Sequence, residues 1–259
     1  MTEKLLFVIL AFLLSACGSV AQPALTPVEH IELNPLATRT VTPAPSPSPT
    51  ATIPTSTPVP TADPNFFRDD FTEALDPNWT WVREDPLNWS LSAVPGSLQI
   101  NVEGGYVPAH TNANMLLRPA PDGNFQIETQ ISYRPNGNFQ FAGLIIYQSD
   151  SDFIQAGREY CGTSFCIGEG LYMENYELGK VVQPTFGQPY RSSNPILLRL
   201  SRRGDTYTFD ASTNGNIWFT VGSHTSEIEP LQIGLVTGQR LKGDVRPAVF
   251  NYFEVRSLP

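Results

Sequence analysis

The sequence has no excess of basic residues. It holds 16 lysines and arginines against 25 aspartates and glutamates, which gives a formal net charge of -9 at pH 7. A protein that binds nucleic acid needs a basic surface to contact the phosphates. The charge balance therefore argues against a nucleic-acid partner, and it fits a soluble domain outside the cell.

The motifs of common hydrolases are also absent. The chain contains no Gly-x-Ser-x-Gly nucleophile elbow and no His-Glu-x-x-His zinc motif. Its three histidines, His30, His110 and His224, are isolated from one another in the sequence. Isolated histidines are typical of ordinary polar positions, so these patterns predict no catalytic residue.

No apolar run is long enough to cross a membrane, which takes about 20 residues. The run from Leu5 to Leu14 has the length of a signal-peptide core. It leads into Leu14-Ser15-Ala16-Cys17, which is similar to the bacterial lipobox, in which the cysteine is lipidated and becomes the new N-terminus. We expect residues 1–17 to be a lipoprotein signal peptide and Cys17 to anchor an extracytoplasmic protein, at the cell surface or in the periplasm. The alternative is an ordinary signal peptide with an accidental cysteine.

Residues 18–64 lack the apolar residues of a folded core. From Thr38 to Pro64 the sequence is dominated by threonine, proline, serine and alanine. Proline fixes φ and removes a backbone donor, so neither helix nor sheet is expected. At about 3.1 Å per residue, this part could span ~75 Å as an extended spacer. We predict a disordered linker that holds a domain away from the membrane; the alternative is disorder without a function.

Residues 65–259 show no long amphipathic helix and no internal repeat, but many short β-type runs. Phe125 to Tyr133 alternates apolar and polar residues, which indicates a strand with one buried face. The apolar run 139–148 and the run 153–159 are joined by Ser149-Asp-Ser-Asp152, which favours a tight turn. Asn214-Gly215 favours a hairpin turn between two further strands. These patterns predict an all-β fold, a two-sheet antiparallel β-sandwich or jelly roll.

Cysteines are few, and their number is odd. If Cys17 is lipidated, Cys161 and Cys166 are left as a pair five residues apart. Outside the cytosol such a pair favours a small disulfide that stiffens the loop between them. A metal site is the alternative, but no other pair of cysteines or histidines lies nearby in the sequence.

Several stretches of the domain resemble a known family. They are Phe66–Phe71, Leu75–Trp81, Asp85–Leu91, Pro95–Ile100, Asn114–Arg118, Phe141–Tyr147, Ile233–Val236 and Phe250–Phe253. They resemble the concanavalin A-like (LamG/jelly-roll) domain at the C-terminus of family 43 β-xylosidases and the related DUF1349 group. In those xylosidases the module accompanies a separate catalytic propeller, and no propeller is evident in this sequence. The resemblance implies a module that helps to shape a sugar pocket rather than one that performs the chemistry.

Catalysis by paired carboxylates is harder to exclude, because glycosidases need only two of them. Jelly-roll glucanases carry Glu-x-Asp-x-Glu on one strand. The nearest stretch here, Glu169 to Glu177, lacks the middle aspartate, and the spacing of Glu169, Glu174 and Glu177 is wrong for one strand face. We therefore predict a protein without enzymatic activity.

Sugar binding needs aromatic platforms and planar polar side chains. The candidate ligand-binding residues are Asn88, Trp89, Arg118, Tyr147, Gln148, Arg158 and Tyr172. Further aromatic candidates are Trp79, Trp81, Tyr106 and Tyr176. The alternative is that the aromatic members belong to the core, as tryptophan and tyrosine do in any sandwich.

Domains of this type often hold a structural calcium ion between the first and last strands. Asp69, Asp70 and Asn251 could supply the oxygen ligands that calcium prefers. Calcium loops normally carry more carboxylates, so calcium is a candidate and not a firm prediction. No other cofactor is predicted.

Together these patterns predict a surface-anchored lipoprotein with a non-catalytic, carbohydrate-binding concanavalin A-like domain. Two alternatives stay open: a structural or protein-interaction module without sugar binding, and a glycoside hydrolase or an accessory module of one. A groove lined by exposed aromatic residues would favour sugar binding, and a flat polar face would favour protein interaction. Two facing carboxylates roughly 5–10 Å apart would favour hydrolysis.

Overall fold

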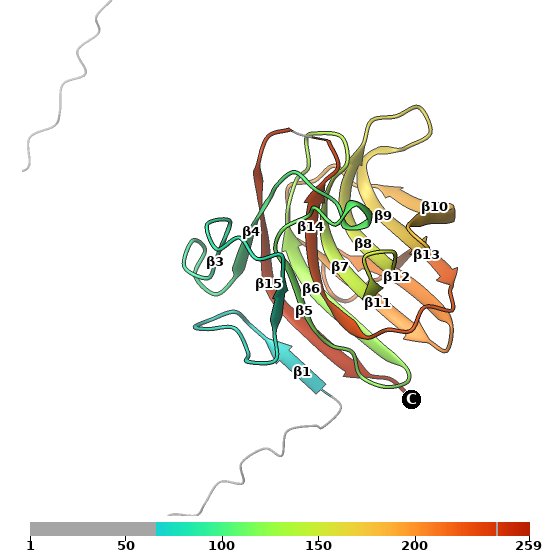
Figure 1. Cartoon of the computed structure of the whole chain (residues 1–259), viewed down its shortest axis with the longest axis horizontal. Coiled ribbons are helices and arrows are strands. Elements are labelled where there is room, and N and C mark those ends of the chain that lie inside the picture. Colours follow the sequence, from blue (N-terminus) through green and yellow to red (C-terminus); the bar gives the residue numbers. More distant parts are fainter. Residues whose placement is uncertain (1–65, 242) are drawn as a thin grey trace, which may run out of the picture. The chain divides into compact units, whose positions relative to one another are not determined.

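The computed structural model describes residues 66–241 and 243–259 (Figure 1). The predictions for the signal peptide, for Cys17 and for the linker lie outside these residues. Within them, no helix is long and apolar enough to cross a membrane. The described part folds into two antiparallel β-sheets that pack face to face, which confirms the predicted all-β sandwich.

Sheet A has eight strands in the order β13-β12-β11-β6-β15-β4-β3, with β1 paired to β15 outside this path. Its strands are β1 (Phe66–Asp69), β3 (Trp89–Ser90), β4 (Leu98–Val102), β6 (Phe125–Ser132), β11 (Ile196–Arg203), β12 (Thr206–Ser212), β13 (Phe219–Thr225) and β15 (Arg246–Ser257). The first and last strands of the described chain are therefore neighbours, and their pairing runs from Phe66 opposite Arg256 to Asp69 opposite Phe253.

Sheet B has seven strands in the order β10-β9-β8-β7-β14-β5-β2. They are β2 (Thr80–Val82), β5 (Met115–Pro119), β7 (Gln140–Ser149), β8 (Asp152–Cys161), β9 (Gly168–Glu177), β10 (Lys180–Pro189) and β14 (Gln232–Gln239). A single 3-10 turn, η1 (Val107–Ala109), is present in the loop between β4 and β5.

The main hydrophobic core lies between the sheets, and strand β6 shows why the sequence builds it. Phe125, Ile127, Thr129 and Ile131 are buried, while the residues between them are half-buried on the other face. The predicted alternation is therefore confirmed. The hydroxyl of Thr129, which is also buried, donates a hydrogen bond to the carbonyl of Tyr252 on β15, so its polar atom is satisfied.

The predicted central hairpin is confirmed: β7 and β8 pair antiparallel, with Ser149 opposite Asp152. The hairpin predicted at Asn214-Gly215 is confirmed in pairing, since β12 and β13 are neighbours, but the turn differs. Residues 213–218 form a longer loop and β13 begins only at Phe219. The Ser212 and Asn214 side chains each accept hydrogen bonds from backbone amides of this loop, which stabilise it in place of a two-residue turn.

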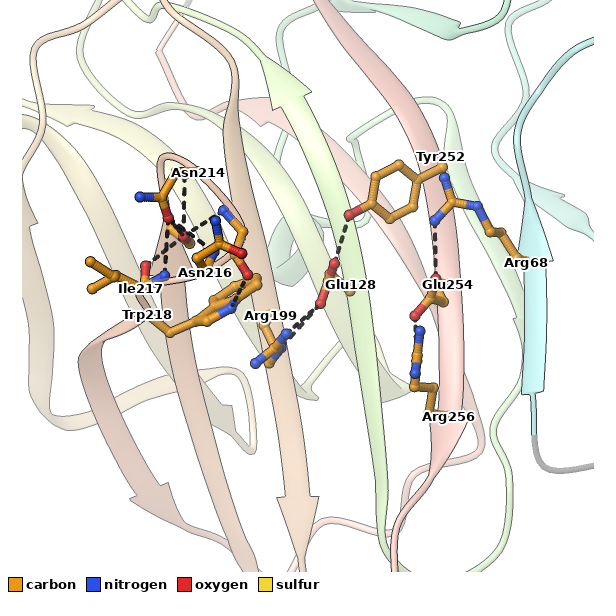
Figure 2. A network of polar contacts seen from close by, with 12 residues as sticks. Arg68, Glu128, Arg199, Asn214, Asn216, Ile217, Trp218, Tyr252, Glu254 and Arg256 are labelled. Carbon is orange, nitrogen blue, oxygen red and sulfur yellow. Dashed lines mark hydrogen bonds and ion pairs between the residues drawn. The ribbon is translucent and has the colours of Figure 1, made fainter.

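The outer face of sheet A, which points away from sheet B, carries a network of charged residues (Figure 2). Arg199 on β11 donates to Glu128 on β6, and its guanidinium lies 3.5 Å from the ring centroid of Trp218. On β15, Glu254 accepts from Arg68 and Arg256. Glu128 and Glu254 are thus each paired with arginine on this face.

Candidate functional site

A second apolar cluster lies on the outer face of sheet B, the face that points away from sheet A. Its members come from η1, β5, β7, β8 and β14: Val107, Met115, Leu117, Phe141, Ile145, Phe153 and Val236. All seven are buried, although they lie outside the space between the sheets. The outer face of sheet B is therefore partly covered, and the residue that covers it from the β4–β5 loop is Val107.

The covering loop is fastened at two points. Near its start, Gly105 and Gln239 exchange two backbone hydrogen bonds of 2.7 Å. Near its end, Arg83 donates to the carbonyl of Asn112 and makes a bidentate contact with Asp150, which also accepts from His110 and Tyr147. We call Arg83, His110, Tyr147 and Asp150 the loop latch.

Two residues of the loop latch have an unfavourable backbone conformation, which their contacts must stabilise. Arg83 and His110 both have positive φ, at 55° and 56°, a conformation that residues with a Cβ adopt rarely. Burial alone would raise the pKa of Asp150, but hydrogen bonds from Arg83 and His110 outweigh it and leave the pKa lowered. The carboxylate form of Asp150 is thus the one that holds the loop.

Two glycines leave the middle of the outer face of sheet B without side chains. Gly143 on β7 and Gly157 on β8 are paired directly. A Cβ at Gly157 would lie 2.3 Å from the carbonyl oxygen of Ala142, and one at Gly143 would lie 2.3 Å from that of Ala156. The backbones approach so closely that only glycine fits, and the side chains around this bare patch border a hollow.

The hollow is a cavity of about 110 Å³. Its walls are aromatic, aliphatic and acidic, and its lining residues are Tyr106, Val107, Phe139, Phe141, Gln155, Glu159, Glu174, Tyr176, Val181, Val236, Thr237, Gly238 and Arg240. One water needs about 10–15 Å³ by this measure, so the cavity has room for a group several times larger. Tyr106 and Arg240 also border a shallower depression of about 620 Å³ beside the cavity, so a longer ligand could extend there.

Two glutamates face the cavity from neighbouring strands. Gln155 on β8 is opposite Glu174 on β9, and Gly157 is opposite Tyr172. Glu159 lies on the same face of β8 as Gln155, four residues further along the strand. It is therefore diagonal to Glu174, and Gly157, which has no side chain, lies between Gln155 and Glu159 on that face. Glu174 Oε2 accepts hydrogen bonds from Gln155 (2.8 Å) and Tyr176 (3.4 Å).

Glu159 is the unusual member of this pair. Its side chain is buried, and Oε2 has no hydrogen-bond partner among the described residues. Burial raises the pKa of Glu159 well above its ordinary value, and the charge of Glu174 raises it further. Burial also raises the pKa of Glu174, against the opposing effect of Gln155, Tyr176 and Arg240. Both carboxyls are thus held toward their protonated forms.

The seven residues predicted to bind ligand do not line the cavity. Tyr147 and Tyr172 lie on the same face of sheet B, but their hydroxyls donate to Asp150 and to the carbonyl of Gly168, and burial raises the pKa of each to about 12. Gln148 accepts a hydrogen bond from the backbone of Glu229. Their role as ligand contacts stays a prediction.

The other four predicted residues make structural contacts. Arg158 is buried and pairs with Glu169. Arg118 lies over the Phe67 ring, with its guanidinium 3.1 Å from the ring centroid, and burial lowers its pKa. Trp89 packs against Trp81 at 4.8 Å, and the Asn88 amide donates to Asp85.

The residues proposed for calcium already make hydrogen bonds or ion pairs with other protein groups. Asp69 accepts hydrogen bonds from the Phe71 amide and the Trp79 indole, and Asp70 pairs with Arg68. Asn251 donates to Gln130. No group of three or more histidine, cysteine, aspartate or glutamate side chains in residues 66–241 and 243–259 is arranged to hold a metal ion. Calcium therefore stays a prediction.

The stretch considered for catalysis is one strand, β9, and its carboxylates point to opposite faces. Glu169 pairs with the buried Arg158, whereas Glu174, five residues later, faces the cavity. Side chains alternate along a strand, so Glu169 and Glu174 cannot act on one ligand.

A disulfide joins Cys161, the last residue of β8, to Cys166 in the loop between β8 and β9.

A family model for the β-xylosidase C-terminal concanavalin A-like domain matches residues 68–256, nearly the whole described domain. The chain belongs to this family. A search of curated proteins found no match.

Solved structures similar to this β-xylosidase C-terminal-type domain include two GH43 proteins and a xylan β-1,4-xylosidase. BlXynB from Bacillus licheniformis is 20% identical with a TM-score of 0.66, and the match covers 77% of this chain and 40% of that one. The Bacteroides ovatus xyloglucan PUL GH43B is 20% identical with a TM-score of 0.64, covering 74% and 39%. The xylan β-1,4-xylosidase from Bacillus halodurans C-125 is 20% identical with a TM-score of 0.63, covering 76% and 40%.

This likeness establishes the fold of the β-xylosidase C-terminal-type domain and not its activity. The chain spans about two fifths of the length of these enzymes. Of the further aromatic candidates, Tyr106 and Tyr176 line the cavity. A further signal lay in the order of residues on β8, where Gln155, Gly157 and Glu159 alternate with Ile154, Ala156 and Arg158, so that this part of one face is polar and has a bare position at Gly157.

Proposed function

We propose that the chain is a carbohydrate-binding protein, and that the cavity on sheet B takes one sugar unit of a polysaccharide without cleaving it. The observation that carries the proposal is the mixed lining of this cavity. Aromatic side chains of Tyr106, Phe139 and Tyr176 suit the apolar faces of a sugar ring, and Gln155 and Glu159 suit its hydroxyls.

The size of the cavity favours a single sugar unit. Its volume of about 110 Å³ is smaller than the 300–1,000 Å³ typical of sites that enclose a drug-sized ligand. Because the shallower depression of about 620 Å³ also borders Tyr106 and Arg240, the neighbouring units of a chain would lie there. The proposal is thus a polysaccharide held at one unit.

The pKa shifts of the two cavity glutamates favour binding without cleavage over hydrolysis. Glycoside hydrolysis uses one protonated and one ionised carboxyl at the working pH. Here burial shifts the pKa values of Glu159 and Glu174 in the same direction, upward, so their roles are not separated. We assign no catalytic residue.

The proposal includes an anchor. A lipid on Cys17 and a spacer of residues 18–64 would hold the domain at an extracytoplasmic membrane surface, where polysaccharides are met. The support is the apolar run Leu5 to Leu14 placed directly before the cysteine, and the proline-rich composition that follows. Metabolic labelling with a radioactive fatty acid tests this part, since Cys17→Ser should abolish the label.

Titration calorimetry on the full chain with a panel of plant and bacterial polysaccharides tests binding, and an assay of reducing ends run in parallel tests cleavage. We expect saturable binding without release of sugar. Tyr106→Ala should weaken binding about tenfold, because an aromatic wall of the cavity is lost. Trp218→Ala truncates an aromatic residue on the outer face of sheet A and should leave affinity unchanged.

Two outcomes would overturn the proposal. Release of reducing sugar would make the domain a hydrolase. Absence of binding to every polysaccharide, in a protein that is folded by circular dichroism, would favour a structural or protein-interaction module.

A further inference from the structure

Three charged side chains line the cavity on sheet B: Glu159, Glu174 and Arg240. If both carboxyls ionise, the cavity carries two negative charges and one positive charge. The lining is therefore one positive charge short of neutrality.

Arg240 does not neutralise either glutamate by contact. Its guanidinium lies 5.3 Å from the ring centroid of Tyr106 and 5.6 Å from that of Phe139. Among the described residues, Glu174 accepts hydrogen bonds from Gln155 and Tyr176, and Oε2 of Glu159 has no partner. The arginine lies near the two rings where the cavity meets the shallower depression, and its charge acts on Glu174 from a distance.

Glu159 shows the consequence most clearly, because it is buried and Oε2 accepts no hydrogen bond from a described residue. A buried carboxyl without a partner must either keep a proton or meet a cation, since an unpaired buried charge is strongly unfavourable. Burial favours the first course, because it raises the pKa of Glu159. A ligand with a positive charge would allow the second.

The walls of the cavity also suit an organic cation. Tyr106, Phe139, Phe141 and Tyr176 contribute four aromatic rings to one small space. The faces of such rings attract ammonium groups by cation–π interaction. A metal ion fits less well, because calcium takes six to eight oxygen ligands, whereas aromatic carbon makes up much of this lining.

We infer that the preferred ligand is an amino sugar, a sugar unit whose protonated amino group lies between Glu159 and Glu174. This inference rests on the proposed function and specifies the class of polysaccharide: one with free, non-acetylated amino groups. The ammonium group donates to both carboxyls, and the sugar ring lies against the aromatic walls. Burial of one positive charge between the two carboxyls makes the occupied cavity neutral, because Arg240 supplies the other.

Three tetrasaccharides with the same β-1,4-linked backbone isolate the amino group: the fully deacetylated chitosan tetramer, the chitin tetramer and cellotetraose. They differ only in the substituent at carbon 2. Calorimetry on the full chain at pH 6.5 should show the chitosan tetramer binding at least tenfold more tightly than the other two. Its heat of binding should also vary with the ionisation enthalpy of the buffer, because the carboxyls release protons when the ammonium group enters.

Glu159→Gln provides the decisive variant, because the amide keeps the shape and removes the charge. It should abolish the preference, so that the variant binds the chitosan tetramer no more tightly than it binds cellotetraose. Asp122→Asn is the matched control, since it removes one negative charge from an exposed loop far from β8 in the sequence. It should keep the preference, which excludes simple attraction of a polycation to an acidic protein.

The outcomes separate the inference from the proposed function. Equal affinity for all three tetramers would overturn the amino-sugar inference and leave carbohydrate binding intact. A preference for chitosan that survives Glu159→Gln would also overturn it. Failure of every carbohydrate to bind would overturn both.

Discussion

Arg158 on β8 donates a 2.8 Å hydrogen bond from Nη2 to Oε1 of Glu169 on β9, and both side chains are almost inaccessible to solvent. A second nitrogen of Arg158 donates to the carbonyl of Ser192, and the guanidinium lies 4.4 Å from the Tyr190 ring centroid. The arginine therefore joins β8 and β9 to the segment that precedes β11. These contacts give it a structural role in the sandwich.

Removal of this arginine should strongly destabilise the fold. Arg158→Met leaves Glu169 buried without its main partner, for which we expect a loss of about 3–5 kcal/mol in the free energy of unfolding. Urea denaturation measures it. The double variant Arg158→Met/Glu169→Leu should recover most of the loss, because no unpaired charge remains. Equal losses in the single and double variants would contradict a role for the ion pair.

Glu159→Gln should stabilise the protein at neutral pH. The pKa of Glu159 is raised in the folded state, so the folded protein holds its proton to higher pH than the unfolded chain does. The free energy of unfolding therefore falls as pH rises from the unfolded-state pKa of glutamate, about 4.3, to the raised folded-state pKa, and falls no further above it. The glutamine variant lacks this loss, and its melting temperature should exceed that of the wild type at pH 7.5 but not at pH 4. A variant less stable than wild type at pH 7.5 would contradict the raised pKa of Glu159 in the folded protein.

Asp150→Asn should release the covering loop. The lowered pKa of Asp150 means that its carboxylate stabilises the fold at neutral pH, and that this contribution is lost as pH falls through the lowered pKa. We expect the variant to lose about 1–3 kcal/mol at pH 7, since Arg83 loses its charged partner. Hydrogen exchange followed by mass spectrometry should show faster exchange in residues 103–114. Unchanged exchange there would mean that Gly105 and Gln239 alone hold the loop.

Gly157→Ala should cost more stability than Gly104→Ala. The new Cβ at position 157 would lie 2.3 Å from the Ala142 carbonyl oxygen, so the paired strands must move apart. We expect a loss of about 1–3 kcal/mol, as for other overpacked sites. At Gly104 nothing lies within 4 Å of the added Cβ, and alanine there should be neutral within about 0.5 kcal/mol. Thermal melts of the two variants give the comparison.

The fold could be predicted from the sequence because its signals are local. The alternation in β6 and the turn between β7 and β8 depend on residues close together in the chain, and both are confirmed. The Asn214-Gly215 turn was predicted too short, because the hydrogen bonds from backbone amides to the Ser212 and Asn214 side chains depend on how the loop folds. Propensity alone does not specify those contacts.

The cavity was harder to predict because a shift of one residue moves a side chain to the other face of a strand. Sequence analysis selected Arg158, which points between the sheets, and passed over its neighbour Glu159, which faces the cavity. Tyr106 and Arg240 come from loops that meet only after folding. On β8 the signal was the alternation of Gln155, Gly157 and Glu159, which places two polar side chains and a bare position on one face.

The pairing of β1 with β15 has a mechanical consequence if the chain is tethered at its N-terminus. A pull transmitted through the spacer would reach Phe66 first and load the four-residue ladder between β1 and β15. That ladder belongs to sheet A, whereas the cavity belongs to sheet B. If tension separates β1 from β15, the strands that carry Glu159 and Glu174 stay paired in sheet B. A polysaccharide in the cavity would therefore stay bound after β1 has detached.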